Sequence, residues 1–272
     1  MEIDEQTSMK KIIYKISPFL LFVVILTVWQ MFASQFPRFN FLFGSPSEIW
    51  ASLVQNTASG LLVGDFFITG FEALTGFVFG VIFGTIAGFI LWYSPLVARI
   101  FRPYIVIFGA IPIFAFAPMV IVWFGIGLSM KIAMATLGAF LVALTQAYEG
   151  AKSIDVEEFR LLKIFGATRF QIFQKVIFPS SLSWVLASMK LNVGFALLGA
   201  FIGEFISSNQ GLGHFMIRSG SLYDIPSVFA GGAYLVLLAL LFNLIVVFVE
   251  KKKMKIIEFF SVDGETKRAL KS

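Results

Sequence analysis

Six long apolar stretches, almost free of ionisable side chains, constrain the fold of this chain more than any other feature. A helix needs about 20 apolar residues to cross the roughly 30 Å hydrocarbon core of a bilayer, where no water is available to hydrogen-bond its backbone. Charged residues make up only 14% of the chain, against about 25% in soluble domains. We therefore predict an all-α, polytopic membrane protein with spans at about 16–37, 68–98, 103–125, 131–148, 180–204 and 226–249.

The basic residues indicate how these spans are oriented, because Lys and Arg are enriched in cytoplasmic loops. With the N-terminus inside, seventeen of the 21 Lys and Arg residues lie on the cytoplasmic side and three on the other. We predict a cytoplasmic segment 1–15, a transmembrane domain 16–250 and a basic cytoplasmic tail 251–272. The net charge of +5 then reflects topology rather than nucleic-acid binding. A cleaved signal peptide is the alternative for the first span, although its apolar run exceeds the roughly 7–15 residues of such a peptide.

Composition also limits the kinds of site that the chain can form. It has no Cys and a single His, His214, in a predicted outer loop. Structural disulfides, thiolate nucleophiles and multi-His or Cys-based metal sites are thereby excluded. A membrane enzyme would need a nucleophile and a base within its spans, and none of the predicted spans contains Asp. We expect neither catalytic residues nor a metal site.

The second span carries four glycines at intervals of four residues, which places them on one face of a helix. Small residues let another helix backbone approach closely in lipid. This row therefore predicts tight packing against a neighbouring helix or a second subunit. The row comprises Gly76, Gly80, Gly84 and Gly88.

Two prolines interrupt the third span, at Pro112 and Pro118. Proline removes a backbone donor and breaks or kinks a helix. Broken helices at membrane depth are tolerated where they are buried in protein or line a water-filled path. Residues 109–118, with Pro112 and Phe114, are thus a candidate wall of a translocation pathway, and a kinked packing helix is the alternative.

The loop at 149–179 is the most informative segment between the spans. Residues 155–165 have apolar side chains at helical spacing, and Gly166 follows where a helix would end. Thr168 can cap a second short helix, 169–178, that ends at Pro179. Two short helices with apolar faces have no room for a core of their own, so we expect a docking surface for a soluble partner.

At this loop the sequence resembles the permease subunits of ATP-binding-cassette (ABC) importers. Their signature reads Glu-Ala-Ala, three residues, Gly, nine residues, Ile-x-Leu-Pro. Gly166, Ala167, Val176, Phe178 and Pro179 match its second half at the right spacing, whereas Arg160, Leu161 and Leu162 stand where Glu-Ala-Ala is expected. Glu157 and Glu158 come three and two residues early, so either of them could replace the missing acid.

Five further motifs, in the family's order, resemble the nitrate, sulfonate, taurine and bicarbonate type of these permeases. They are Gly44-Ser-Pro-Ser-Glu48, residues 109–118, Trp123-Phe-Gly-Ile-Gly127 with Lys131, residues 148–155, and Glu204 with Gly211-Leu-Gly213. Together with the loop, the resemblance covers roughly residues 43–249.

The resemblance implies a permease subunit in a bacterial-type inner membrane, with six helices and a pathway along the axis of a homodimer. An extracytoplasmic binding protein would deliver the solute, which could be nitrate, a sulfonate, taurine, bicarbonate or a thiamine-precursor-like pyrimidine. Cytoplasmic ATPase subunits would bind ATP and Mg and act through the loop 149–179, hereafter the coupling loop. The chain itself would need no cofactor, in line with its lack of a G-x-x-x-x-G-K-[ST] phosphate loop. The implied ATPase-coupling residues are Glu157, Glu158, Arg160, Leu161, Leu162, Gly166, Ala167, Phe178 and Pro179.

Three ionisable residues within or at the ends of spans are further pathway candidates, because charges in lipid are costly. Lys190 could attract an anionic solute or form an ion pair. Glu204 could instead hold the outer loop at Gly211–Gly213, as the resemblance suggests. Glu72 stands where the family usually has Arg, and we hypothesise that this reversal alters which solute is admitted.

A secondary transporter or channel not driven by ATP is the rival interpretation. Such proteins usually carry intramembrane carboxylates for ion coupling or an internally repeated fold. The sequence shows neither a carboxylate chain nor a convincing repeat between its halves.

Overall fold

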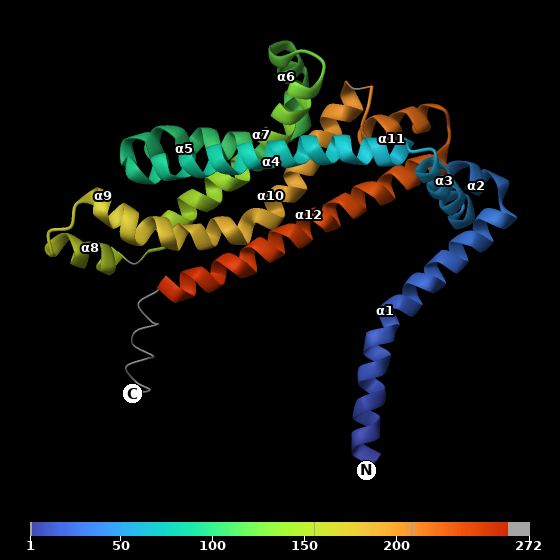
Figure 1. Cartoon of the computed structure of the whole chain (residues 1–272), viewed down its shortest axis with the longest axis horizontal. Helices are drawn as coiled ribbons and strands as arrows, with labels where there is room; N and C mark the ends of the chain where they lie inside the picture. The colour runs from blue at the N-terminus through green and yellow to red at the C-terminus, as the bar shows by residue number, and fades with distance from the viewer. Residues whose placement is uncertain (1, 155, 208, 261–272) are drawn as a thin grey trace. The chain divides into compact units, whose positions relative to one another are not determined.

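The computed structural model describes residues 2–260 apart from 155 and 208, and side chains for 17–250 apart from 114, 155, 156, 158 and 208. The described residues form helices joined by short turns, with no strand among them (Figure 1). The predicted all-α class is therefore confirmed. Of the predicted tail 251–272, residues 261–272 and the side chains of 251–260 lie outside the described residues, as do residue 1 and the side chains of the predicted N-terminal segment 1–15.

Five helices in the described part are long and apolar enough to cross a bilayer. They belong to α1 (Glu2–Gln35), α4 (Leu61–Tyr93), α7 (Leu128–Lys152), α10 (Phe178–Ile206) and α12 (Ile225–Phe260). These helices coincide with five of the six predicted spans. α4 ends earlier than predicted, at Tyr93, because Ser94 and Pro95 start a new helix and the Ser94 hydroxyl accepts a hydrogen bond from the amide of Val97.

The predicted third span, 103–125, is not one continuous helix, in line with the break that Pro112 predicts. The segment consists of α5 (Pro95–Ala110), a single 3₁₀ turn η1 (Ile113–Phe116) and α6 (Ala117–Phe124). The break falls at Ile111, whose extended backbone (φ −79°, ψ 126°) is the conformation that a following proline imposes. Pro118 sits in the first turn of α6, where its missing amide hydrogen costs nothing.

The glycine row of α4 lies against α7. A Cβ added at any of the four glycines would come within 3.0 Å of an alanine or of backbone in α7: Gly76 at Ala135, Gly80 at Ala139, Gly84 at Ala143 and Gly88 at Ala147. The residue numbers of the contacting glycines and alanines rise together, so α4 and α7 run parallel. The intervening α5, η1 and α6 must therefore carry the chain back from the end of α4 to the start of α7.

The same reasoning orients the other long helices of this part. Gly138 of α7 faces Phe195 of α10 and Gly150 faces Trp184, so α7 and α10 are antiparallel. Phe66 of α4 contacts Tyr234 of α12 and Gly70 contacts Leu238, so α4 and α12 are parallel. Consequently the starts of α4 and α7 and the end of α10 lie at one end of the bundle, and the coupling loop lies at the other.

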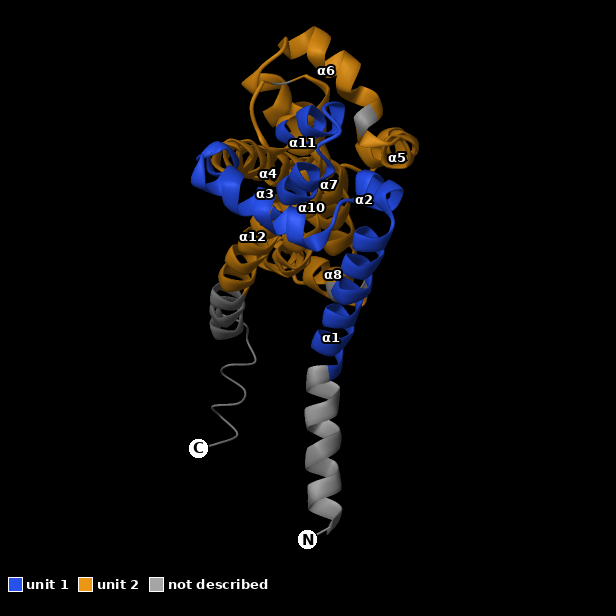
Figure 2. Ribbon diagram, turned by 90° about the vertical axis from the view of Figure 1, so that its right-hand side faces the viewer, with its two compact units in different colours: residues 1–63, 215–233 blue, residues 64–214, 234–272 orange. Residues whose placement is uncertain are grey.

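The chain divides into two compact units (Figure 2). Unit 1 comprises Met1–Val63 and Phe215–Ala233 and includes α2 (Pro37–Phe43), α3 (Pro46–Ala58) and most of α11 (Leu212–Ser221). Within it, the Trp29 indole donates to the carbonyl of Gly44, and the hydroxyls of Ser52 and Ser227 are 2.8 Å apart. Unit 2, Gly64–His214 with Tyr234–Ser272, contains the remaining features described below.

Candidate functional site

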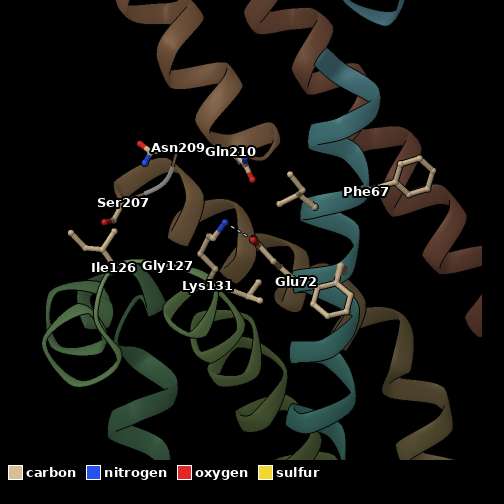
Figure 3. A pocket seen from close by; sticks show the side chains of 11 residues that line it. Phe67, Glu72, Ile126, Gly127, Lys131, Ser207, Asn209 and Gln210 are labelled. Atoms are coloured by element: carbon tan, nitrogen blue, oxygen red, sulfur yellow. Dashed lines mark ion pairs between the residues drawn. The ribbon is translucent and has the colours of Figure 1, made fainter. Parts of the chain in front are cut away.

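A charged cavity of about 660 Å³ lies at one end of unit 2 (Figure 3). It is formed by the start of α4, the turn into α7 and the segment that follows α10. Apolar and aromatic side chains make up most of its wall, and one ion pair, one hydroxyl and two amides supply the polar groups. The lining residues are Phe67, Ile68, Phe71, Glu72, Ile126, Gly127, Leu128, Lys131, Ser207, Asn209 and Gln210.

The ion pair joins Glu72 of α4 to Lys131 of α7, and the two side chains point toward one another (Figure 3). The Glu72 side chain is fully buried and that of Lys131 is 7% exposed. Each residue lies four positions before a contact of the glycine row, Gly76 against Ala135. The close, parallel packing of the two helices therefore sets the register that brings these charges together, and each charge offsets the desolvation cost of the other.

A second carboxylate, Glu204 at the end of α10, is also fully buried. It accepts hydrogen bonds from the Thr69 hydroxyl (2.6 Å) and from the amide of Gly213 (2.7 Å). Gly211 has a φ of +106° and, like Gly213, leaves no room for a Cβ beside this carboxylate. Glu204 therefore holds residues Gly211–Gly213 at the start of α11, as the resemblance suggests.

Side chains on one face of α4 also bind the start of α11. Asp65, Thr69 and Glu72 recur at helical spacing, and the first two bind backbone amides at the start of α11. The Asp65 carboxylate accepts from Gly211 (2.7 Å), and the Thr69 hydroxyl accepts from Leu212 (2.9 Å). Carboxylates at a helix N-terminus satisfy its free amides and complement its dipole. The start of α11 is thus fixed to α4 and α10.

The pathway residues expected from sequence do not all meet at this cavity. Glu72 lines the cavity, whereas Glu204 is not among the lining residues and accepts a hydrogen bond from Thr69, which lies three positions before Glu72 on α4. Lys190 is elsewhere: its ammonium group lies 3.2 Å from Glu250 of α12, and its side chain is 46% exposed. Pro112 lies exposed in the break after α5, and the side chain of Phe114 is outside the described residues.

Sequence reasoning missed the partnership of Lys131, which it used only as part of a motif. A signal was available, because Glu72 precedes the glycine row by one helical turn and Lys131 begins the predicted fourth span. To recognise the Glu72–Lys131 pair, one must know which helix packs against the glycine row. The spacing of the glycines alone is compatible with several helices as that partner.

The coupling loop at the opposite end of unit 2 begins with α8 (Val156–Ile164). Gly166 follows with a φ of +80°, the left-handed conformation that favours glycine. Thr168 caps α9 (Arg169–Ile172) in a reciprocal capping box with Gln171. The predicted end of α8 before Gly166 and the Thr168 cap are both confirmed.

The second predicted helix, 169–178, does not end at Pro179. α9 continues through one π-helical turn, η2 (Phe173–Ile177), directly into α10, and the amide of Phe178 bonds to the carbonyl of Phe173. Pro179 lies in the first turn of α10, where a proline needs no backbone donor. The helical segment therefore runs from Arg169 past Pro179 to Ile206.

Side chains of the coupling loop divide into an anchored and an exposed set. Ile172 and Ile177 are buried against Phe89 of α4, Ala147 and Ala151 of α7, and Val185 of α10, with Leu162 and Ala167 packed at the edge. Leu161, Ile164, Phe165 and Phe170 are exposed, as are Glu157 and Arg160. Glu158 lies among the residues whose side chains are not described.

Comparison with known proteins identifies the family. Residues 80–255 match the family described as binding-protein-dependent transport system inner membrane component. The chain is 31% identical to a probable ABC transporter permease protein of Haemophilus influenzae, over 83% of this chain and 91% of that protein. It is 29% identical to the formylaminopyrimidine transport permease protein ThiX of Halalkalibacterium halodurans, over 86% and 92%. Other relatives are named for transport of aliphatic sulfonates in Bacillus subtilis and of taurine in Escherichia coli.

A solved structure of the MetNI methionine ABC transporter, in an inward-facing conformation, has the same fold. The match has a TM-score of 0.61 at 22% identity and covers 72% of this chain and 96% of that one. These findings confirm the resemblance seen in the sequence. The chain belongs to the family of inner membrane components of binding-protein-dependent transport systems, the permease subunits of ABC importers.

Proposed function

We propose that two copies of this chain form the solute pathway of an ATP-driven importer, with ATPase subunits bound at the coupling loop. The observation that carries this proposal is the exposure of apolar side chains on and just after α8. Leu161, Ile164 and Phe165 are exposed to 53%, 80% and 78%. Apolar groups clustered on a polar, charged loop mark a surface that a protein partner covers.

The anchoring of the loop supports the same interpretation. Its exposed helix α8 is joined to α9 and η2, whose inner residues Ile172 and Ile177 are buried against three long helices. A partner that pushed on α8 would therefore act on the membrane bundle rather than on a free loop. In this proposal the ATPase subunits bind ATP and Mg, and this chain contributes no catalytic residue.

The charged cavity at the opposite end supports a proposed role in admitting the solute from an extracytoplasmic binding protein. Its wall combines aromatic side chains with Lys131, Glu72 and the amides of Asn209 and Gln210. Such a lining suits a small polar or charged molecule. We propose a small solute, often anionic, such as nitrate, a sulfonate, taurine or bicarbonate, or else a thiamine-precursor-like pyrimidine. The named relatives support the sulfonate, taurine and pyrimidine members of this range. The family match favours this importer over a carrier or channel independent of ATP.

Replacing Ile164 by Asp tests the docking surface. The full chain is co-expressed with its ATPase subunit, and the amount of ATPase that co-purifies is measured. We expect Ile164→Asp to lose most of the bound ATPase, because a carboxylate in an apolar interface must be desolvated without a partner. The variant should still fold, since the Ile164 side chain contacts solvent.

Leu222→Asp is the matched control, because Leu222 is a similarly exposed apolar residue at 70% and lies outside the coupling loop. It should retain the ATPase. Equal binding by Ile164→Asp and the unmodified chain would contradict the assigned surface. Uptake that persists without ATP and without an ATPase partner would overturn the importer proposal itself.

A further inference from the structure

The cytoplasmic-side end of α4, as we assign it, is held to the coupling loop by a cluster of aromatic rings, here called the aromatic clamp. Phe173 of η2 lies at its centre, stacked on Trp92 (centroids 5.8 Å apart) and edge-on to Phe89 (5.4 Å). The clamp consists of Phe89, Trp92 and Tyr93 of α4, Phe159 of α8, Arg169 of α9, Phe173 of η2 and Phe178 of α10.

Arg169 closes the clamp on its polar side. Its guanidinium lies 5.7 Å from the Trp92 ring and 5.2 Å from the Tyr93 ring. It also donates a long hydrogen bond, 3.5 Å, to the carbonyl of Trp92 in the last turn of α4. Carbonyls in a last turn lack helical partners, and a cation there complements the helix dipole as well as the ring faces.

The clamp connects segments that are distant in sequence. In the chain, the coupling loop connects α7 to α10 and is not directly connected to α4. Through the clamp it also contacts α4, because Arg169 binds Trp92, 77 residues earlier in the sequence. Trp92 also contacts Phe159 of α8, the helix that carries the exposed docking side chains. A displacement of α8 and α9 is thereby applied to α4 as well.

α4 leads from the clamp to the charged cavity. Trp92 and Glu72 lie on the same uninterrupted helix, about 30 Å apart at the helical rise of 1.5 Å per residue. The glycine row between them is in backbone contact with α7, which leaves little room for α4 to slide along it. Because the glycine row holds α4 against α7, a force on the clamp would move the two helices together, and the cavity end of α4 with them.

We propose that the aromatic clamp transmits ATPase-driven motion from the coupling loop to α4 and so to the charged cavity, with Trp92 and Arg169 as its positioning residues. This inference rests on the proposed function. The π-helical turn η2 contributes, because it carries Phe173 and Lys175 between the loop and α10 in a backbone form often found at functional sites. The ATPase would still bind and hydrolyse ATP without the clamp, but the cavity would not respond.

The chain has no native Cys, so one introduced thiol can report on the cavity. Phe67→Cys places that thiol on α4 at the cavity wall, where it is labelled with a membrane-impermeant maleimide. The complex of the full chain with its ATPase is reconstituted in vesicles of bacterial phospholipid. The labelling rate is compared with and without ATP plus vanadate, and ATP hydrolysis is measured on the same samples.

In the Phe67→Cys background we expect ATP plus vanadate to change the labelling rate. Adding Trp92→Ala should abolish that change while ATP hydrolysis and ATPase co-purification persist. Trp92→Phe should restore the response because it keeps a ring against Phe173, and Arg169→Lys should weaken it because an ammonium cannot stack on two rings. Trp50→Ala, at an exposed tryptophan of unit 1, is the matched control and should respond normally.

The outcomes separate the two proposals. A full response in Trp92→Ala would overturn the clamp and leave the importer function intact. No response in the Phe67→Cys background, together with no ATPase co-purification, would overturn the proposed function. Loss of ATPase binding in both Trp92→Ala and Trp92→Phe would assign the clamp to docking and contradict its role in transmission.

Discussion

Glu72 and Lys131 show how a membrane protein can bury charge. Both side chains are almost completely shielded from solvent, and each is the other's ion-pair partner across the contact of α4 with α7. Losing one member leaves an uncompensated charge in a low dielectric, which typically costs about 3–5 kcal/mol. Lys190 and Glu250 differ, because their pair is partly solvated and pairs of that kind are worth about 0–1 kcal/mol.

At the residue scale we therefore predict that Glu72→Gln lowers the thermal unfolding temperature of the purified protein. Lys131 would remain buried and would lose its ion pair with Glu72. The double variant Glu72→Gln/Lys131→Gln should recover much of the loss, since it removes both charges, and Lys190→Gln should change little. The measurement is a melting curve in detergent for each of the four proteins.

The same variant bears on selectivity. If the charge of Glu72 sets the electrostatic potential at the cavity, the Glu72→Gln permease should differ from the unmodified one in its relative uptake of labelled anionic and neutral solutes. An unchanged preference would remove Glu72 from the selectivity question. An unaltered melting temperature would show that the ion pair contributes nothing to stability.

At the scale of single elements, the turn between α8 and α9 depends on one backbone conformation. Gly166 has a φ of +80°, and an added Cβ there would meet no atom within 4 Å. The position is thus restricted by dihedral strain and not by space. A β-branched residue is disfavoured there, whereas Asn tolerates the left-handed region.

We predict that Gly166→Val uncouples ATP hydrolysis from solute uptake while the membrane bundle stays folded. The altered turn would change the angle between the exposed helix α8 and the anchored α9. Gly166→Asn should remain coupled and serves as the matched control. The measurement is the ratio of solute transported to ATP hydrolysed, and normal transport by Gly166→Val would contradict the assignment of this loop to coupling.

The glycine row illustrates why element packing is predictable only in part. Its period of four is enough to identify the close-packed face of α4 from the sequence. The spacing leaves the partner open between the other long helices and a second subunit, because small residues occur on many of their faces. The matching row of Ala135, Ala139, Ala143 and Ala147 on α7 decides the matter in the structure.

At the scale of the whole molecule, the directions of the long helices define two ends of unit 2. The charged cavity lies at one end and the coupling loop at the other. The uneven distribution of basic residues predicts that the coupling loop is cytoplasmic. The proposed mechanism requires the same orientation, since ATP is available only on that side.

We predict that Lys175→Cys is labelled by an impermeant maleimide only after the cytoplasmic side is opened, whereas Asn209→Cys is labelled from outside intact cells. Both residues are exposed, and they lie at opposite ends of unit 2. The chain without introduced thiols provides the blank, because it has no Cys. The reverse pattern would invert the topology and rule out docking of a cytoplasmic ATPase on α8.

The sequence by itself determined the membrane class, the helical content, the position of the turn between α8 and α9, and the family, because each depends on features local to the chain. Apolar run length, the Gly166 and Thr168 signals and motif spacing need no knowledge of which helices are neighbours. Even the break of the third span was visible at Pro112, although its division into three pieces depends on how the chain turns between parallel helices.

Only the tertiary structure decided the Glu72–Lys131 pair, the binding of the Thr69 hydroxyl to the amide of Leu212, and the clamping of α4 to the coupling loop. All three join residues from different helices, and their partners lie 59, 143 and 81 positions apart. Helix period and hydrophobicity specify which face a residue occupies but not which helix that face meets. That choice is made by backbone packing at the glycine row, where small residues admit one neighbour in one register.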